Sequence, residues 1–79
     1  MDYEKVLKAA ENKLPEEFAS VVQDIKNGIR GGSTGGEIIG RVGKYLKDLK
    51  FTNEKAYMIL KEDIDHYLSE CERHDIIIL

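Results

Sequence analysis

The sequence predicts an all-α protein, a single-domain bundle of four helices with a short apolar tail at the C-terminal end. Apolar residues recur at intervals of three and four along most of the 79-residue chain, which is the spacing of one helix face. Hydrophobic residues make up 42% of the chain and charged residues 34%, as is typical of a folded domain. We therefore expect helices over residues 2–14, 15–30, 35–50 and 53–74, within one domain of residues 1–79.

The first two helices are separated by Pro15. Their apolar stripes are Tyr3, Val6, Leu7, Ala10 and Leu14, then Phe18, Val21, Val22, Ile25 and Ile29. Proline disfavours helical geometry in the preceding residue and is tolerated at the first position of a helix, so Pro15 is expected to end one helix and begin the next. Because Ile29 is in phase with Ile25, the second helix is expected to continue through Gly28, at a cost of about 1 kcal/mol relative to alanine. A stop at Gly28 is the alternative.

A glycine-rich turn, residues 31–36, joins the second helix to the third. Gly31 is expected to end the second helix in the left-handed conformation, with Arg30 close to the negative end of the helix dipole. Thr34 and Glu37 have the spacing of a capping box, in which each side chain bonds the main-chain amide of the other residue. The turn lacks the lysine and the preceding strand of a phosphate-binding P-loop, so we interpret it as structural.

The third and fourth helices are also amphipathic. Their apolar residues are Ile38, Ile39, Val42, Tyr45, Leu46 and Leu49, then Ala56, Tyr57, Leu60, Ile64, Tyr67, Leu68 and Cys71. Gly36, Gly40 and Gly43 each weaken the third helix intrinsically by about 1 kcal/mol. We therefore expect another backbone to approach that side of the helix closely. Thr52 or Asn53 is expected to cap the fourth helix.

The tail, Ile76–Leu79, is β-branched and not amphipathic, and is expected either to pack on the bundle or to pair with a partner. No apolar run approaches the roughly 20 residues of a membrane span, and the first fourteen residues lack the apolar segment of a signal peptide. The single cysteine, Cys71, has no partner for an internal disulfide. We expect a cytoplasmic protein that does not associate with membranes, as a monomer or a small homo-oligomer.

The net charge of −3 is unevenly distributed. Residues 1–27 carry four bases and six acids, residues 28–50 five bases and two acids, and residues 51–79 three bases and seven acids. Such segmentation bears on partners rather than on fold, because complementary charge speeds association. The residues predicted to contact a protein partner are Arg41, Lys44 and Lys47 on the third helix and Glu62, Asp65 and Glu72 on the fourth. The leading hypothesis is therefore a non-enzymatic protein-binding module.

A nucleic-acid-associated regulator is the alternative. It would use Arg30 at the end of the second helix together with Arg41, Lys44 and Lys47, which recur every third residue on the third helix in a row that continues to Lys50. The negative net charge argues against this class, since nucleic-acid binders are usually basic. The connection between the second and third helices is also longer and looser than the turn of a helix-turn-helix motif.

A metal-dependent enzyme is a third, disfavoured class. His66, Glu70 and His74 recur at intervals of four on the fourth helix, with Cys71 nearby. They lack the paired motifs of zinc proteins, and no third group is arranged to orient a base beside Cys71. We predict no catalytic residue, no metal ion and no cofactor.

Residues 29–39 carry the pattern I-x-x-G-S-T-G-x-E-I. This stretch resembles a motif of small helical bacterial proteins of immunity-type or uncharacterised role, in which it joins two helices. The resemblance covers the middle of the chain and carries no catalytic residue across. It implies a cytoplasmic bacterial protein that binds and neutralises a partner, such as a toxin domain made by the same cell. Gly40 and Gly43 depart from the pattern, where bulkier apolar residues are usual.

Overall fold

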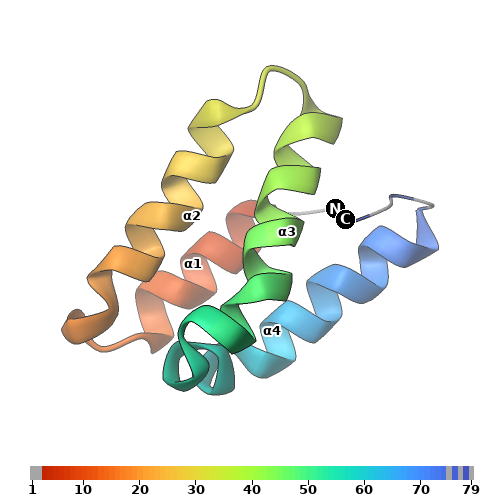
Figure 1. Ribbon diagram of the computed structural model, residues 1–79. Helices are drawn as coiled ribbons and strands as arrows, with labels where there is room; N and C mark the ends of the chain where they lie inside the picture. Colours follow the sequence, from red (N-terminus) through yellow and green to blue (C-terminus); the bar gives the residue numbers. More distant parts are fainter. Residues whose placement is uncertain (1–2, 75, 77, 79) are drawn as a thin grey trace.

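The computed structural model, which describes residues 3–74, 76 and 78, confirms an all-α bundle of four helices (Figure 1). The α-helices are α1 (Tyr3–Lys13), α2 (Ala19–Gly31), α3 (Gly35–Thr52) and α4 (Glu54–Arg73). A single 3-10 turn, η1 (Glu16–Phe18), precedes α2. The predicted boundaries are correct to within about two residues except at the start of α2; the predicted first residue, 2, lies outside the described residues.

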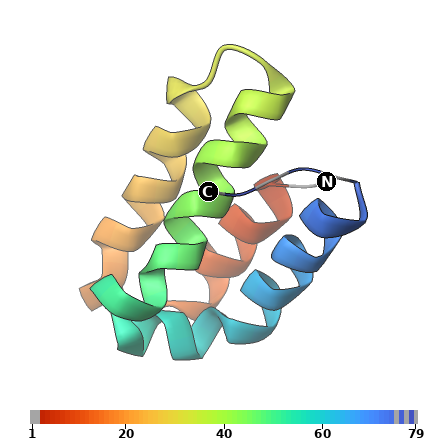
Figure 2. The ribbon, with the colours of Figure 1, turned by 45° about the vertical axis from the view of Figure 1, so that its right-hand side comes forward.

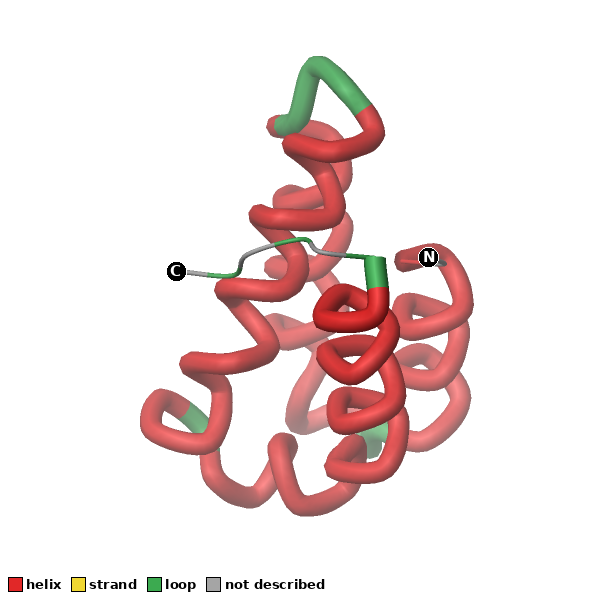
Figure 3. Tube along the Cα trace, turned by 90° about the vertical axis from the view of Figure 1, so that its right-hand side faces the viewer, coloured by secondary structure: helices red, strands yellow, loops and turns green. Residues whose placement is uncertain are grey.

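Consecutive helices run in opposite directions, and the main packing pairs are α1 with α2, α2 with α3, α3 with α4, and α4 with α1 (Figures 1 and 2). The bundle is therefore of the up-and-down type rather than orthogonally packed. The turn that joins α2 to α3 projects beyond the neighbouring ends of α1 and α4 (Figure 3). All four helices contribute to one core.

The core confirms the predicted apolar stripes. Its buried residues are Val6, Ala10, Val21, Ile25, Val42, Leu46, Leu49, Ala56, Leu60, Ile64, Tyr67 and Cys71. The remaining stripe residues are half-buried against them. Among the described residues no buried side-chain polar atom lacks a hydrogen-bond partner, as a stable interior requires.

The start of the second helix differs from the prediction. Pro15 caps the 3-10 turn in an extended conformation, with φ −61° and ψ 161°, and α2 begins only at Ala19. The main-chain amide of Phe18 donates a hydrogen bond to the oxygen of Pro15 over 2.9 Å. Proline therefore ends α1 as predicted, but the chain needs one tighter turn before α-helical bonding resumes.

Two predictions about the glycine-rich turn have different outcomes. The left-handed ending at Gly31 is wrong: Gly31 is the last residue of α2, and Gly32 leaves it with φ −89° and ψ 143°. Glycine is required at position 32 for space, because a Cβ there would collide with the side chain and main chain of Ile38. The cap at Thr34 is confirmed, since its hydroxyl accepts a hydrogen bond from the amide of Glu37 over 3.2 Å.

The prediction that another backbone approaches the glycines of α3 closely is wrong at Gly36 and Gly40. A Cβ at either position would meet no other atom within 4 Å. Gly43 does face a close neighbour, but that neighbour is the side chain of Ile78 rather than another helix. The three glycines do share one face of α3 by their spacing, but this face is covered only at Gly43, and there by a side chain of the C-terminal tail rather than by a helix backbone.

Asn53 resolves the choice between two candidate caps. Its side-chain oxygen accepts from the amide of Ala56 over 3.2 Å, and its own amide donates to the oxygen of Leu49 over 2.7 Å. Thr52 is the last residue of α3. One residue therefore ends α3 and starts α4, which keeps the corner between them short.

Candidate interface between α3 and α4

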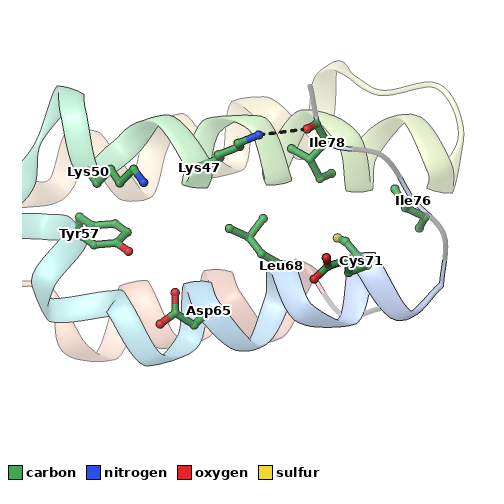
Figure 4. A pocket seen from close by; sticks show the side chains of 9 residues that line it. Lys47, Lys50, Tyr57, Asp65, Leu68, Cys71, Ile76 and Ile78 are labelled. Atoms are coloured by element: carbon green, nitrogen blue, oxygen red, sulfur yellow. Dashed lines mark hydrogen bonds between the residues drawn. The ribbon is translucent and has the colours of Figure 1, made fainter.

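Three of the six residues predicted to bind a partner line a single hollow between α3 and α4. They are Lys47 from α3 and Asp65 and Glu72 from α4, and the hollow has a volume of about 670 Å³. Figure 4 shows it from close by. The helices place opposite charges on facing walls, because the basic segment of the sequence forms α3 and the acidic segment forms α4.

The hollow combines a charged rim with apolar lining. Lys47 and Lys50 come from α3, and Asp65 and Glu72 come from α4. The apolar and aromatic lining residues are Tyr57, Leu68, Cys71, Ile76 and Ile78 (Figure 4). Protein interfaces commonly have an apolar centre inside a polar rim. The arrangement therefore suits recognition of a protein surface or segment.

Three of the four charged residues of the rim, Lys47, Lys50 and Asp65, have local partners. The Asp65 carboxylate lies 3.1 Å from the ammonium of Lys61, and this hydrogen bond raises the pKa of Lys61. Lys47 donates a hydrogen bond of 3.3 Å to the main-chain oxygen of Ile78. The ammonium of Lys50 stands 5.1 Å from the centre of the Phe51 ring. These exposed pairs position the rim and add little stability.

Arg41 and Lys44 do not share this hollow. They line a second one, of about 750 Å³, between α2 and α3. Three residues advance a helix by about 300°, so a basic residue at every third position drifts by about 60° per step around the axis. The predicted basic row of Arg41, Lys44, Lys47 and Lys50 is therefore divided between two sides of α3.

Arg41 also has a structural role that the sequence did not reveal. Its Nε donates a hydrogen bond of 3.2 Å to the main-chain oxygen of Gly28, in the last turn of α2, and its guanidinium covers Gly31. The last carbonyls of a helix lack partners within the helix, and a cation there is favourable to the dipole. Arg41 thus helps to terminate α2.

Apart from Asp65 and Glu72, the charged and histidine residues of α4 lie outside the hollow. Glu62 is exposed, and the imidazole of His66 stands 3.1 Å from the carboxylate of Glu70. Cys71 is a core residue, only 1% exposed, and burial raises the pKa of its thiol. Across residues 3–74, 76 and 78, no group of three or more His, Cys, Asp or Glu side chains has the arrangement of a metal site.

Sequence reasoning missed an exposed apolar surface on the other side of α4. Met58 and Ile59 are 60% and 39% exposed and line a shallow hollow together with Phe18 and Pro15. Phe51, at the end of α3, is 79% exposed. The sequence does contain a signal for this surface. Met58 and Ile59 fall outside the apolar stripe of the fourth helix, which continues through Leu60, and therefore point away from the core.

The chain matches no protein family, no curated protein and no solved structure in comparisons with known proteins. In the described part of the chain, no helix has both the length and the apolar character needed to span a bilayer.

Proposed function

We propose that this protein is a non-enzymatic protein-binding module and that its partner docks at the hollow between α3 and α4. The observation that carries the proposal is the convergence of Lys47 from α3 with Asp65 and Glu72 from α4 on one apolar-lined hollow. A partner with complementary charges would be steered to this site and oriented by the rim.

The division of the basic row supports a protein partner over a nucleic acid. A duplex contacts cations that lie along one continuous face, whereas Arg41 and Lys44 lie on a different side of α3 from Lys47 and Lys50. Arg41 is also engaged with the main chain of α2. In its specific form the proposal is a bacterial immunity or antitoxin-like role, in keeping with the resemblance of residues 29–39.

Two charge reversals on one helix test the proposal. Glu72→Lys changes the rim, whereas Glu62→Lys makes the same change at an exposed glutamate of α4 outside the hollow. A partner captured by the wild-type chain after nuclease treatment should be lost with Glu72→Lys and kept with Glu62→Lys. Equal capture by both variants, or retention only on DNA or RNA at low salt, would refute it.

For the immunity-type form, the captured partner should be toxic when expressed alone. Co-expression of the wild-type chain or Glu62→Lys should restore growth, and Glu72→Lys should not. A partner without toxicity would leave the binding function standing and remove this specific role.

A further inference from the structure

The C-terminal segment places two isoleucine side chains in the hollow between α3 and α4. Ile76 and Ile78 line it and pack against the core, at the end away from Lys50 and Tyr57 (Figure 4). The amide of Ile76 donates a hydrogen bond of 2.9 Å to the oxygen of Cys71 in α4. The oxygen of Ile78 accepts one from Lys47 in α3. The predicted tail is therefore docked at these two residues; Ile77 and Leu79 lie outside the described residues.

Gly43 provides the space that Ile78 occupies. A Cβ at position 43 would lie 2.6 Å from Cδ1 and 3.1 Å from Cγ1 of Ile78. Both distances are shorter than ordinary van der Waals contact, so even alanine would force the end of the Ile78 side chain to shift. The missing side chain thus creates a recess in α3 that fits the end of an aliphatic side chain. This fit explains why a buried position in the middle of a helix holds glycine.

The tail fills only part of the hollow. Ile76 and Ile78 remain half-buried, and the space beside them continues along Leu68 toward Tyr57 and Lys50. A few contacts from one short segment hold the tail in place. A longer segment with the same spacing of aliphatic side chains would use the same recess and also cover Leu68.

We infer that the hollow is a binding seat for a protein segment with aliphatic side chains two residues apart, and that the chain's own Ile76 and Ile78 occupy it until a partner segment of this chemistry displaces them. The inference rests on the proposed function, because it names the kind of partner that the same hollow accepts. A partner segment can bind only those molecules in which the tail has left the hollow, so its apparent affinity is the intrinsic affinity multiplied by the fraction of such molecules. Its tether gives it an effective concentration of the order of millimolar, so only a segment with additional contacts competes well.

Cys71 provides an internal reporter of occupancy. It is the only cysteine of the sequence, it lines the hollow together with Ile76, and its main-chain oxygen accepts the hydrogen bond from the Ile76 amide. Only the thiolate reacts rapidly with disulfide reagents, and burial hinders both ionisation and access. Departure of the tail should therefore raise the rate at which dithiobis-nitrobenzoate modifies Cys71 in the full-length chain.

The first measurement compares two Ile→Asp substitutions in the full chain. Ile78→Asp introduces a charge into the seat, and Ile59→Asp introduces the same charge at an exposed position elsewhere on α4. Modification of Cys71 should be at least about tenfold faster in Ile78→Asp, because thiol reactivity follows access and ionisation. It should be unchanged in Ile59→Asp, with equal helix content by circular dichroism. Equal rates in Ile78→Asp and the wild-type chain would overturn the inference.

Gly43→Ala offers a second route if Ile78→Asp does not fold. Alanine at position 43 would push the end of the Ile78 side chain out of its recess, while Gly40→Ala makes the same change where the added carbon meets open space. Only Gly43→Ala should accelerate the modification of Cys71. Equal rates for the two alanine variants would also overturn the inference.

The second measurement adds a synthetic peptide of residues 73–79 to Ile78→Asp. At millimolar concentration the peptide should occupy the vacated seat and slow the modification of Cys71, and a peptide with aspartate in place of both Ile76 and Ile78 should not. Adding Gly43→Val to Ile78→Asp should abolish the protection. Equal protection by the two peptides would refute a seat with aliphatic specificity.

The two proposals fail in different ways. If the peptide protects Cys71 but no captured partner depends on Glu72, the seat stands and the proposed function is wrong. If such a partner is captured but does not accelerate or block the modification of Cys71, the function stands and displacement of the tail is wrong.

Discussion

The hydroxyl of Tyr67 in α4 donates a hydrogen bond of 2.9 Å to the main-chain oxygen of Ile39 in the first half of α3. Tyr67 is only 3% exposed, so a buried tyrosine with its polar end satisfied links these two helices. The bond lies inside the bundle, beside the core. It helps to set the separation of the helices that form the walls of the hollow.

Removal of this hydroxyl should destabilise the protein without changing its fold. Tyr67→Phe is expected to lower the free energy of unfolding by about 1 kcal/mol, the usual net value of one hydrogen bond. Urea denaturation followed by circular dichroism measures the change. Tyr57→Phe is the matched control, because Tyr57 is half-buried on the same helix and its hydroxyl has no hydrogen bond with the described residues. A similar loss in both variants would contradict the assigned role of the bond.

Stability should fall at alkaline pH because of two tyrosines. Burial raises the pKa of Tyr67, and burial together with a hydrogen bond to Asp24 raises the pKa of Tyr45. Unfolded tyrosine loses its proton near pH 10, whereas the folded forms keep theirs. Their stabilising contribution is therefore complete below about pH 10 and is lost progressively as the pH rises above it.

The double variant Tyr45→Phe with Tyr67→Phe tests this dependence. Its free energy of unfolding should decrease less than that of the wild-type chain between about pH 8 and about pH 11. Hydrogen bonds to Asp63 and Asp65 raise the pKa values of Lys13 and Lys61, and these lysines contribute in the same direction to both proteins. Parallel pH profiles would show that the tyrosines do not contribute.

Loss of the Asn53 side chain should destabilise the protein more than loss of the neighbouring Thr52 side chain. Asn53→Ala removes the cap of α4 and is expected to cost about 1 kcal/mol of stability. Thr52→Ala should cost only a few tenths, because Thr52 is the exposed last residue of α3. Thermal and urea unfolding of the two variants measure the difference. Equal costs would show that the Asn53 side chain does not act as the cap seen here.

Alanine at two glycines of α3 should have opposite effects. Gly40→Ala is expected to stabilise the protein by about 0.5 to 1 kcal/mol, because it improves helix propensity and the added carbon meets open space. Gly43→Ala gains the same propensity but collides with Ile78, and should be at least about 1 kcal/mol less stable than Gly40→Ala. Chemical denaturation measures both values. Equal stabilities would contradict the recess at Gly43.

Much of the fold was predictable because its signals are local. The apolar stripes, the cap at Thr34 and the break at Pro15 depend on residues within one or two turns of each other. The start of α2 was less predictable, since a 3-10 turn and the first turn of an α-helix suit the same sequence. The left-handed ending at Gly31 was wrong because glycine also serves where another side chain needs space, as Ile38 does at Gly32.

The candidate interface was only half predictable. Charge segmentation selected Lys47, Asp65 and Glu72, which the structure places in one hollow. It also selected Arg41 and Lys44, because spacing in the sequence does not show which side of α3 faces α4. The apolar tail was recognised as needing a covering surface, but its seat depends on Gly43, a residue more than thirty positions away.

The sequence by itself determined the four helices, the faces that they bury and the class of the fold. These properties follow from periodicity and capping, which act over a few residues. Only the tertiary structure decided that the Ile78 side chain occupies the space left by Gly43 and that Lys47 donates a hydrogen bond to the main-chain oxygen of Ile78. It also decided that Arg41 bonds the main chain in the last turn of α2. Such contacts depend on how the helices are rotated and spaced against each other, which packing of the whole chain sets.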